Sequence, residues 1–326
     1  MYRALVTGAN GFIGSHLVEK LISEKVEVRC LVRQTSNLQW IDRTKVSIVF
    51  GDINQPESLE PAVKDVDLIY HLAGKTAAQS EAEYRRVNVF GTELLLKTIS
   101  EHNPHLKRFV FISSQAAGGP STKDHPLTET SDPHPVTPYG RSKLAAEKAV
   151  RGADRIPFTI IRPPSVFGPR DTDFLQLFQT VQKGVITKLG FKERRYSMIY
   201  VEDLVRGIWQ ASINPDTVNQ LYYLADPEPV SWEQLCKAIA EVFTKKTISL
   251  SIPVPLFAMV VLISDAYSKV TGKRVILNKG KLPEFMARYW ECQPEKAVHT
   301  FGFKPDFTLK EGVEKTVRWY RTNGWL

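Results

Sequence analysis

Short apolar runs alternate with amphipathic stretches through the first half of the chain. Runs of five to seven mainly apolar residues predict buried strands, and the stretches between them, with apolar residues three and four positions apart, predict helices. The predicted strands are residues 2–6, 26–32, 46–50, 68–72, 107–112 and 158–162, and the clearest helices are 12–23, 81–102 and 138–150. This alternation is typical of an α/β fold with a Rossmann-like, doubly wound parallel sheet.

The pattern changes after Pro169. A helix over 173–183 is followed by a strand-like run at 198–201 and a helix over 202–213, which we expect to return to the sheet. From about residue 228 the chain is mostly helical, apolar and aromatic. We therefore predict a cofactor domain of residues 1–170, with 196–225 returning to it, and a smaller, mostly helical substrate lobe of 171–195 and 226–326. Its apolar character favours a substrate with a large apolar portion.

One helix of this lobe, predicted over 255–270, has two interpretations. Its composition predicts a buried or lid helix, whereas the flanking Lys269, Lys273 and Arg274 leave open peripheral contact with a membrane surface. The longest apolar run, residues 252–263, is too short to span a bilayer and contains two prolines.

Three glycines follow the first predicted strand at a spacing of three. Gly8 allows a tight turn, Gly11 lets the backbone approach a phosphate, and Gly14 lets the next helix pack closely on the sheet. The free amides at the start of that helix can then bind a pyrophosphate. The spacing differs from the more usual GxGxxG, but a strand precedes it and a helix follows. The expected dinucleotide contacts here are Gly8, Asn10, Gly11, Phe12, Ile13 and Gly14.

The end of the second predicted strand bears on the choice of cofactor. Arg33 stands there, about twenty residues past the glycine turn, where an acidic residue would hold the ribose 2′-hydroxyl of NAD. A guanidinium with the neighbouring hydroxyls fits a 2′-phosphate better. We therefore predict NADP as the preferred cofactor, with NAD as the alternative.

Further cofactor contacts are expected after the third and fourth strands. Asp52, with Ile53, could contact the adenine edge, although Asp52 could equally cap the helix that starts after Pro56. Small residues after the fourth strand would let the backbone lie against the dinucleotide, and we interpret His71 as a packed strand residue rather than a base. The predicted contacts there are Leu72, Ala73 and Gly74.

The candidate chemistry is concentrated in Tyr139 and Lys143, which stand four residues apart at the start of a helix. Thr137 and Pro138 suit the N-cap and first turn, so both side chains should share one helix face. A nearby cation and the positive helix end favour the phenolate and should lower the pKa of Tyr139. Ser113 and Ser114, at the carboxyl end of the fifth strand, can reach a substrate oxygen at the same edge.

Composition describes an ordinary globular protein with a net charge of +8 over 326 residues. The 43 Lys and Arg are mixed with 35 acidic residues, so we expect no nucleic-acid partner. Three distant cysteines and seven histidines show neither disulfide nor metal spacing, and Met1 leads directly into a strand. We therefore expect no metal, no secretory signal and a cytoplasmic location.

Together, these motifs resemble the extended short-chain dehydrogenase/reductase superfamily and its NAD-dependent epimerase/dehydratase group. The resemblance covers nearly the whole chain and implies that Tyr139 transfers a proton, that Ser114, rather than Ser113, orients the substrate oxygen, and that Lys143 binds the nicotinamide ribose. It further implies hydride transfer between substrate and nicotinamide. The motifs are Thr7-Gly8-x-x-Gly11-x-x-Gly14, Ser114, Tyr139-x-x-x-Lys143 and Arg162-Pro163-x-x-Val166-Phe167-Gly168-Pro169, of which Pro163 and Val166 are expected beside the cofactor.

Departures from the family pattern bear on the reaction. Gln115-Ala116-Ala117 replaces the acidic pair of the dehydratases, and Ser165 stands where sugar-nucleotide epimerases usually place an asparagine. Arg194 and Arg195 lie near, but out of register with, the arginine that holds the substrate diphosphate in those epimerases.

The beginning and the end of the chain look like one branch, the dihydroflavonol reductases and 3β-hydroxysteroid dehydrogenases. The residues concerned are Leu31-Val32-Arg33, Trp290, Lys296, Phe301-Gly302-Phe303-x-Pro305 and Trp319-Tyr320-x-x-x-Gly324-Trp325. We therefore expect a dehydrogenase/reductase acting on a secondary alcohol or ketone. A nucleotide-sugar epimerase and a catalytically silent regulatory or scaffold protein stay open as alternatives.

The resemblance also implies a homodimer formed through the helices predicted over 81–102 and 138–150. Leu94, Leu95, Leu144 and Val150 are the candidate apolar contacts, unless they only pack on the sheet.

Overall fold

The computed structural model describes residues 1–271 and 279–326, and the side chains up to residue 267 before that gap. Lys273 and Arg274, and the side chain of Lys269, lie outside the described part. No helix in the described part is long and apolar enough to cross a membrane.

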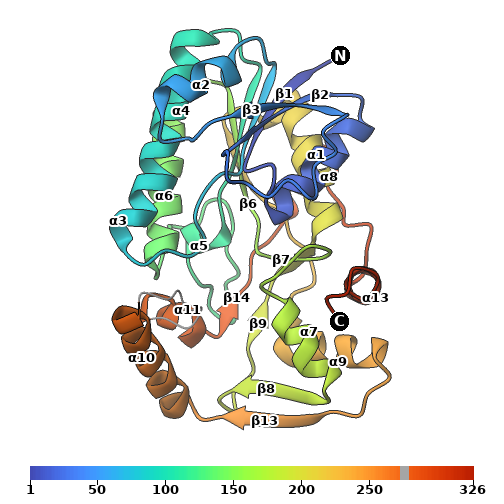
Figure 1. The fold of residues 1–326 in the computed structure, drawn as a ribbon. Coiled ribbons are helices and arrows are strands. Elements are labelled where there is room, and N and C mark those ends of the chain that lie inside the picture. Colours follow the sequence, from blue (N-terminus) through green and yellow to red (C-terminus); the bar gives the residue numbers. More distant parts are fainter. Residues whose placement is uncertain (272–278) are drawn as a thin grey trace.

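A seven-stranded sheet forms the centre of the molecule, and every neighbouring pair in it is parallel (Figure 1). Across the sheet the order is β11-β6-β5-β4-β1-β2-β3. The order reverses between β1 and β4, which is where a doubly wound sheet opens a crevice at its carboxyl edge. The strands are β1 Arg3–Thr7, β2 Glu27–Val32, β3 Val46–Phe50, β4 Leu68–His71, β5 Arg108–Ile112, β6 Phe158–Arg162 and β11 Gln220–Tyr223.

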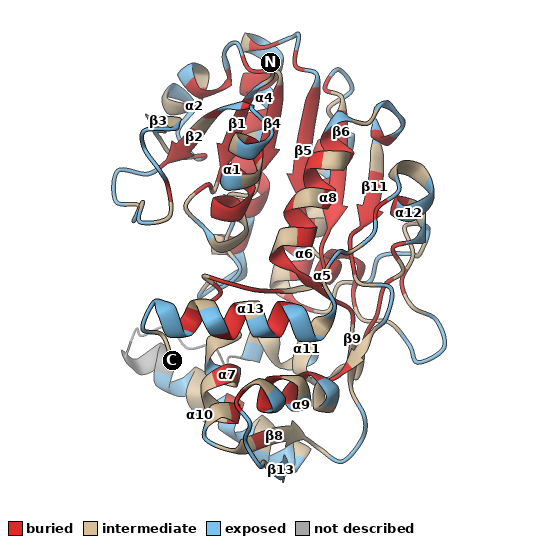
Figure 2. Ribbon diagram, turned by 90° about the vertical axis from the view of Figure 1, so that its right-hand side faces the viewer, coloured by how far each residue is buried: buried red, intermediate tan, exposed pale blue. Residues whose placement is uncertain are grey.

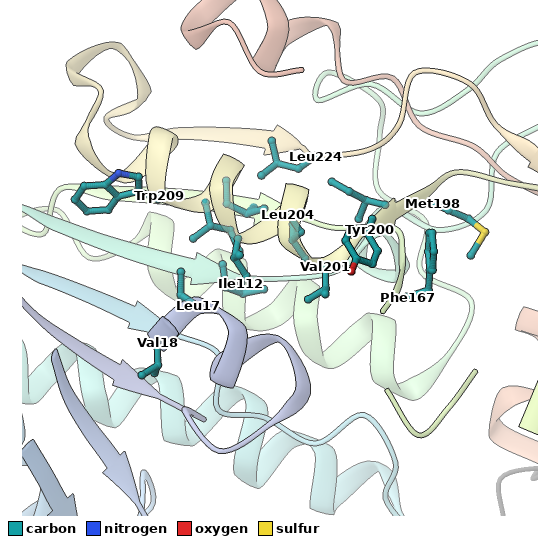
Figure 3. Packing of buried hydrophobic residues seen from close by; sticks show 14 of the residues in the cluster. Leu17, Val18, Ile112, Phe167, Met198, Tyr200, Val201, Leu204, Trp209 and Leu224 are labelled. Atoms are coloured by element: carbon teal, nitrogen blue, oxygen red, sulfur yellow. The ribbon is translucent and has the colours of Figure 1, made fainter. Parts of the chain in front are cut away.

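Helices cover both faces of this sheet, so the predicted fold class is confirmed (Figure 1). Residues that alternate along each strand enter two separate apolar cores, as the pleat requires. One core contains α1 (Phe12–Ser23) and α8 (Val201–Ile213), and the other contains α2 (Pro56–Val63), α4 (Gly91–His102) and α6 (Pro138–Arg151). Figure 3 shows Leu204 and Val201 of α8 in the first of these cores, together with Ile112 of β5 and with Tyr200 at the start of the helix.

Two sequence predictions about the return to the sheet are corrected. The run predicted at 198–201 forms β10 (Met198–Tyr200), but it pairs with β7 (Ser165–Phe167) in a separate two-stranded sheet. The seventh strand is instead β11, which the sequence did not reveal and which pairs with β6.

The helix predicted over 81–102 is also interrupted. It consists of α3 (Glu81–Tyr84), a π-helical segment (Arg85–Phe90) and α4.

A second group of elements lies beyond the carboxyl edge of the sheet, and we call it the second lobe (Figure 1). Short sheets there join distant segments: β8 pairs with β13, and β9 pairs with both β12 and β14. Near the carboxyl terminus α13 packs against α9. The elements of this lobe are α7 Leu175–Gln182, β8 Val185–Leu189, β9 Arg195–Tyr196, β12 Val230–Ser231, α9 Trp232–Val242, β13 Ile248–Ile252, α10 Val254–Thr271, a 3-10 turn Lys279–Lys281, α11 Leu282–Met286, β14 Tyr289–Trp290 and α13 Leu309–Thr322. Two further elements, a 3-10 turn Pro215–Thr217 and α12 Glu295–Phe301, pack beside the main sheet.

The helix predicted over 255–270 is present as α10, but it is not a buried helix. Of its side chains up to residue 267, only Val261 is buried, and Figure 2 shows α10 in the colours of exposed and intermediate residues. Phe257 packs against Phe285 of α11, with ring centroids 5.5 Å apart. The periodicity was that of a helix, but it did not reveal that the apolar side faces outward.

The helices proposed for a dimer contact are used partly inside the subunit. Leu95 and Val150 are fully buried in the core beneath the sheet, whereas Leu94 and Leu144 are half-buried. The homodimer therefore stays a prediction, and Leu95 and Val150 are removed from its candidate contacts because they pack on the strands.

Candidate active site

The glycine turn between β1 and α1 is built around two close approaches of the backbone. Gly8 has a φ of +72°, and a Cβ there would lie 2.7 Å from the amide nitrogen of Ala73. A Cβ on Gly14 would overlap the carbonyl oxygen of Gly8. Only glycine satisfies both requirements, so the turn lies tightly between the end of β4 and the start of the helix.

The start of α1 offers free amides to an anion. Its N-cap is Gly11, no side chain caps it, and its first turn contains no acidic residue. Unpaired helix amides and the positive end of the helix dipole favour a phosphate group at such a terminus. The absence of Cβ atoms in this cradle and the uncapped helix both fit a dinucleotide pyrophosphate.

A cavity of about 270 Å³ extends from this turn along the ends of β2, β3 and β4. It brings together nine of the residues that the sequence assigned to the cofactor. Those nine are Gly8, Asn10, Gly11, Arg33, Asp52, Ile53, Leu72, Ala73 and Gly74. Phe12, Ile13 and Gly14 lie in the first turn of α1 and do not line it. The cavity also includes Ser36, one of the hydroxyls expected beside Arg33, and residues that the sequence did not assign to the cofactor, namely Leu31, Val32, Gly51, Asn54, Lys75 and Val87.

Arg33 and Asp52 differ in how they meet this cavity. Arg33 is exposed, and its backbone amide donates to the hydroxyl oxygen of Ser36 at 3.1 Å. Asp52 accepts from the backbone and side-chain nitrogens of Asn54 at 2.9 and 2.8 Å. The carboxylate therefore closes a turn, and the alternative that it caps α2 is wrong, since Gln55 is the N-cap of that helix.

Ser114 and Tyr139 meet at the carboxyl edge of the sheet. Ser114 caps the short helix α5 (Gln115–Gly118), accepting from the amide of Ala116 at 3.1 Å, and its hydroxyl lies close enough to the Tyr139 phenol to lower the pKa of Tyr139. The start of α6 is as predicted, because Thr137 accepts from the amide of Gly140 at 3.0 Å and Pro138 occupies the first turn. A serine hydroxyl and a phenol thus lie together where a substrate oxygen can reach both.

The expected lowering of the Tyr139 pKa is wrong for this structure. Burial raises the pKa to about 12, and the Ser114 hydrogen bond opposes that rise without cancelling it. Lys143 is also buried, and its ammonium donates to the carbonyl oxygen of Ile112 at 2.6 Å and lies over the Phe111 ring. Burial lowers the pKa of Lys143 to about 8, while Glu147 opposes that fall.

Ser113 points into a different environment from its neighbour Ser114. Its hydroxyl donates to the Glu147 carboxylate at 2.5 Å, and that carboxylate is held by Arg162 through two bonds of 2.8 and 2.7 Å. Arg162 in turn donates to the phenol of Tyr223 at 2.9 Å. All these side chains are buried, so Ser113 belongs to an internal ion-pair network and Ser114 is the serine beside Tyr139.

The matching family is clear over most of the chain. Residues 4–225 match the NAD dependent epimerase/dehydratase family. This chain belongs to that family. It is therefore an enzyme of the NAD-dependent epimerase/dehydratase type, as the resemblance implied.

The relatives of this epimerase/dehydratase family member include both reductases and epimerases. It is 30% identical to the ceramide reductase of Caulobacter vibrioides over 98% of this chain and 95% of the relative. It is 28% identical to the UDP-glucose 4-epimerase of Vibrio cholerae over 96% and 94%. Its fold is similar to that of the Thermus thermophilus UDP-glucose 4-epimerase solved with NAD, with a TM-score of 0.79, 22% identity and coverage of 98% and 99%.

Asn88 is held by the π-helical segment in this family member, next to the cavity. Its amide oxygen accepts from the amide of Lys75 at 2.7 Å, and its amide nitrogen donates to the Lys75 carbonyl at 3.0 Å and to Ser142 of α6 at 2.9 Å. The side chain therefore ties the segment that follows Gly74 to α6. Sequence analysis missed Lys75, whose position directly after Ala73-Gly74 was the available signal.

The remaining predicted residues lie at the ends of strands. Pro163 follows β6 and accepts from the amide of Gln115 at 2.9 Å, and Val166 pairs with Ile199 across β7 and β10. Neither lines the 270 Å³ cavity. His71 is fully buried between the hydroxyls of Thr7 and Thr92, and burial lowers its pKa to about 3, so its prediction as a packed strand residue is confirmed.

Proposed function

We propose that this family member is an NADP-preferring dehydrogenase/reductase that interconverts a ketone and a secondary alcohol on a bulky, largely apolar molecule. The observation that carries this proposal is that Ser114 and the phenol of Tyr139 lie together at the carboxyl edge of the sheet, with Lys143 one turn further along α6. The similarity to a ceramide reductase supports a lipid-like substrate. The exposed guanidinium of Arg33 on the cavity wall supports NADP.

The cofactor would be held by the glycine turn at its pyrophosphate, by Arg33 and Ser36 at its ribose phosphate, and by the backbone of Leu72 to Gly74. Asp52 and Ile53 would face the adenine, and Pro163 and Val166 the nicotinamide side. A bound nicotinamide supplies or accepts the hydride.

The chain's own residues handle the proton. Tyr139 has a pKa of about 12, so it is protonated at neutral pH and suited to donate to the substrate oxygen during reduction. Ser114 donates a hydrogen bond to the same oxygen and fixes its place. Lys143 carries a positive charge at the base of the site, where it favours the phenolate left by proton transfer.

A nucleotide-sugar epimerase is the second candidate, supported by the similarity to the Vibrio cholerae enzyme. The arginines that could have bound a substrate diphosphate are engaged elsewhere. Arg194 donates to the carbonyl oxygens of Leu189, Phe285 and Ala287, and Arg195 pairs with the buried Glu291 at 3.0 Å. These contacts join segments of the second lobe and speak against a diphosphate site at this place.

The test is turnover of NADPH by the purified protein. We expect oxidation of NADPH with a long-chain 3-oxo lipid or a polycyclic ketone, and a loss of about 10²- to 10⁴-fold in kcat for Tyr139→Phe. The variant should keep its thermal stabilisation by NADPH, which shows that the cofactor site is intact. Interconversion of UDP-glucose and UDP-galactose with retained NAD would contradict the proposal and favour the epimerase.

A further inference from the structure

The outward side of α10 carries an apolar stripe where a helix in water normally carries polar residues. Leu256, Met259, Val260, Ile263 and Tyr267 follow one another at steps of three, one, three and four residues, which places them on one helix face. Their exposed fractions lie between 42% and 61%. The inward side is apolar as well, since Val261 is buried and Phe257 packs against Phe285.

The strand before α10 continues this surface. Ile248 and Leu250 alternate along β13 and are 70% and 52% exposed. Phe191, at 85% exposure, follows Gly190, whose amide donates to the carbonyl of Ile252 at the junction of β13 and α10. Most of the large exposed apolar side chains of the described residues are therefore gathered at one end of the molecule, the lower end in Figure 1.

The charge at this end is mainly positive, although Lys188 pairs with Glu233 and the exposed Glu193 follows Lys192. Residues 183–192, 243–271 and 279–290 contain nine Lys or Arg and only two acidic residues. Lys192, Lys245, Lys246 and Lys279 are exposed, whereas the rest of the chain mixes the two signs. An apolar stripe with basic residues around it matches a bilayer interface, where the apolar side chains enter the acyl boundary and the cations lie at anionic headgroups.

We propose that α10, with β13 and Phe191, docks this enzyme on the surface of a membrane that contains anionic lipid. The occupant of the apolar face is the lipid interface, because a second protein copy would carry the same positive charge to the contact. This inference goes beyond the proposed reaction. Because membrane binding is measured without turnover, the docking proposal and the proposed reaction can be contradicted independently of each other.

The experiment is co-sedimentation of the full chain with vesicles. We would compare phosphatidylglycerol mixed equally with phosphatidylethanolamine against pure phosphatidylcholine. The test variant is Val260→Glu with Ile263→Glu on the stripe. The matched control is Ile213→Glu with Val298→Glu, two side chains of 43% exposure on α8 and α12, away from α10 and β13. Both variants add two negative charges, so a difference between them reports position rather than net charge.

We expect the wild type and the control to bind anionic vesicles, the stripe variant to bind them roughly ten-fold more weakly, and salt to weaken binding. All three proteins should keep the same thermal stabilisation by NADPH, which excludes misfolding as the cause. Equal binding by the stripe variant and the control, or no binding by the wild type, would overturn the proposal. It would also be overturned if light scattering without lipid reported a dimer that only the stripe variant dissociates, because a second copy would then cover the face.

Discussion

The carboxylate of Glu147 is held in a buried, two-bond ion pair with the guanidinium of Arg162, one helical turn beyond Lys143. One carboxylate oxygen of Glu147 accepts from both Ser113 and Arg162, and the other accepts from Arg162. The buried negative charge of Glu147 is therefore compensated inside the protein. The pair joins α6 to β6 directly beneath the site and opposes the fall in the Lys143 pKa.

Glu147→Gln should therefore be costly. It leaves the buried Arg162 charge without its partner, and such losses amount to about 3–5 kcal/mol of unfolding free energy. Chemical denaturation monitored by circular dichroism measures the change. Glu60→Gln, which breaks an exposed pair with Lys64, serves as the control and should change little. Similar stabilities for the two variants would contradict the importance assigned to the buried pair.

The buried ammonium of Lys143 should lower the free energy of unfolding by an amount that depends on pH. Its pKa is about 8 in the folded protein against 10.5 for an ordinary lysine, so below pH 8 the folded state holds a buried charge that disfavours folding. As the pH rises from 8 towards 10.5 the folded state releases its proton first, and this cost disappears. The groups around the ammonium are the Ile112 carbonyl, Glu147 and the neutral His71.

Lys143→Met should accordingly be inactive but more stable than wild type at pH 7, by up to about 3 kcal/mol on the scale of 1.36 kcal/mol per pKa unit. The gain should shrink between pH 8 and pH 10. Urea unfolding across this range tests the sign, with Lys148→Met, an exposed lysine of the same helix, as the control. A stability difference that stays constant with pH would show that the Lys143 charge is not the cause.

Arg33→Ala should weaken NADPH more than NADH, because it removes the guanidinium that would pair with the 2′-phosphate. A charge-assisted bidentate contact of this kind contributes about 1.5–3 kcal/mol, or roughly 10- to 150-fold in Kd. Calorimetric titration with both cofactors measures the ratio. Arg43→Ala removes the same charge from an exposed position outside the cavity and should leave the ratio unchanged. If NADPH and NADH are weakened equally, Arg33 contributes only general attraction for an anionic cofactor and does not recognise the 2′-phosphate.

Gly14→Ala should damage the cofactor site through the backbone. The new methyl group would overlap the Gly8 carbonyl oxygen, so α1 must move away from the turn. We expect lower stability and loss of the thermal shift given by either cofactor. Gly152→Ala, whose Cβ would lie 3.4 Å from its nearest neighbour at the end of α6, is the matched control and should bind normally. Normal cofactor binding by Gly14→Ala would show that the close approach is not required.

The sequence predicted the individual strands and helices well, because neighbouring residues determine them, but it did not predict how the strands pair. Six strands and the helices between them follow from apolar periodicity and from Gly and Pro at their ends. The partner of a strand does not follow from its own residues. For that reason Met198–Tyr200 was assigned to the main sheet and Gln220–Tyr223 was missed, although both are short apolar runs.

The candidate site shows the same division. The glycine turn and Arg33 were found because their spacing along the chain carries the signal. The pKa of Tyr139 was predicted in the wrong direction because burial, the largest cause of its rise, is set by segments far away in the sequence, such as Tyr84, whose ring lies 6.1 Å from the Tyr139 ring. For a related reason, the sequence left both a buried helix and membrane-surface contact open for α10, since periodicity identifies a helix face but not the direction in which it points.

The path of the chain between its two halves limits how this enzyme can be re-engineered. It leaves the sheet after β6, comes back to contribute α8 and β11, and leaves again for α9 and α10. A transplant of residues 171–290 as one cassette from a relative would thus import an edge strand and a covering helix foreign to the recipient sheet. We therefore expect chimeras to remain folded when they keep the host's α8 (Val201–Ile213) and β11 (Gln220–Tyr223), although such chimeras need extra junctions.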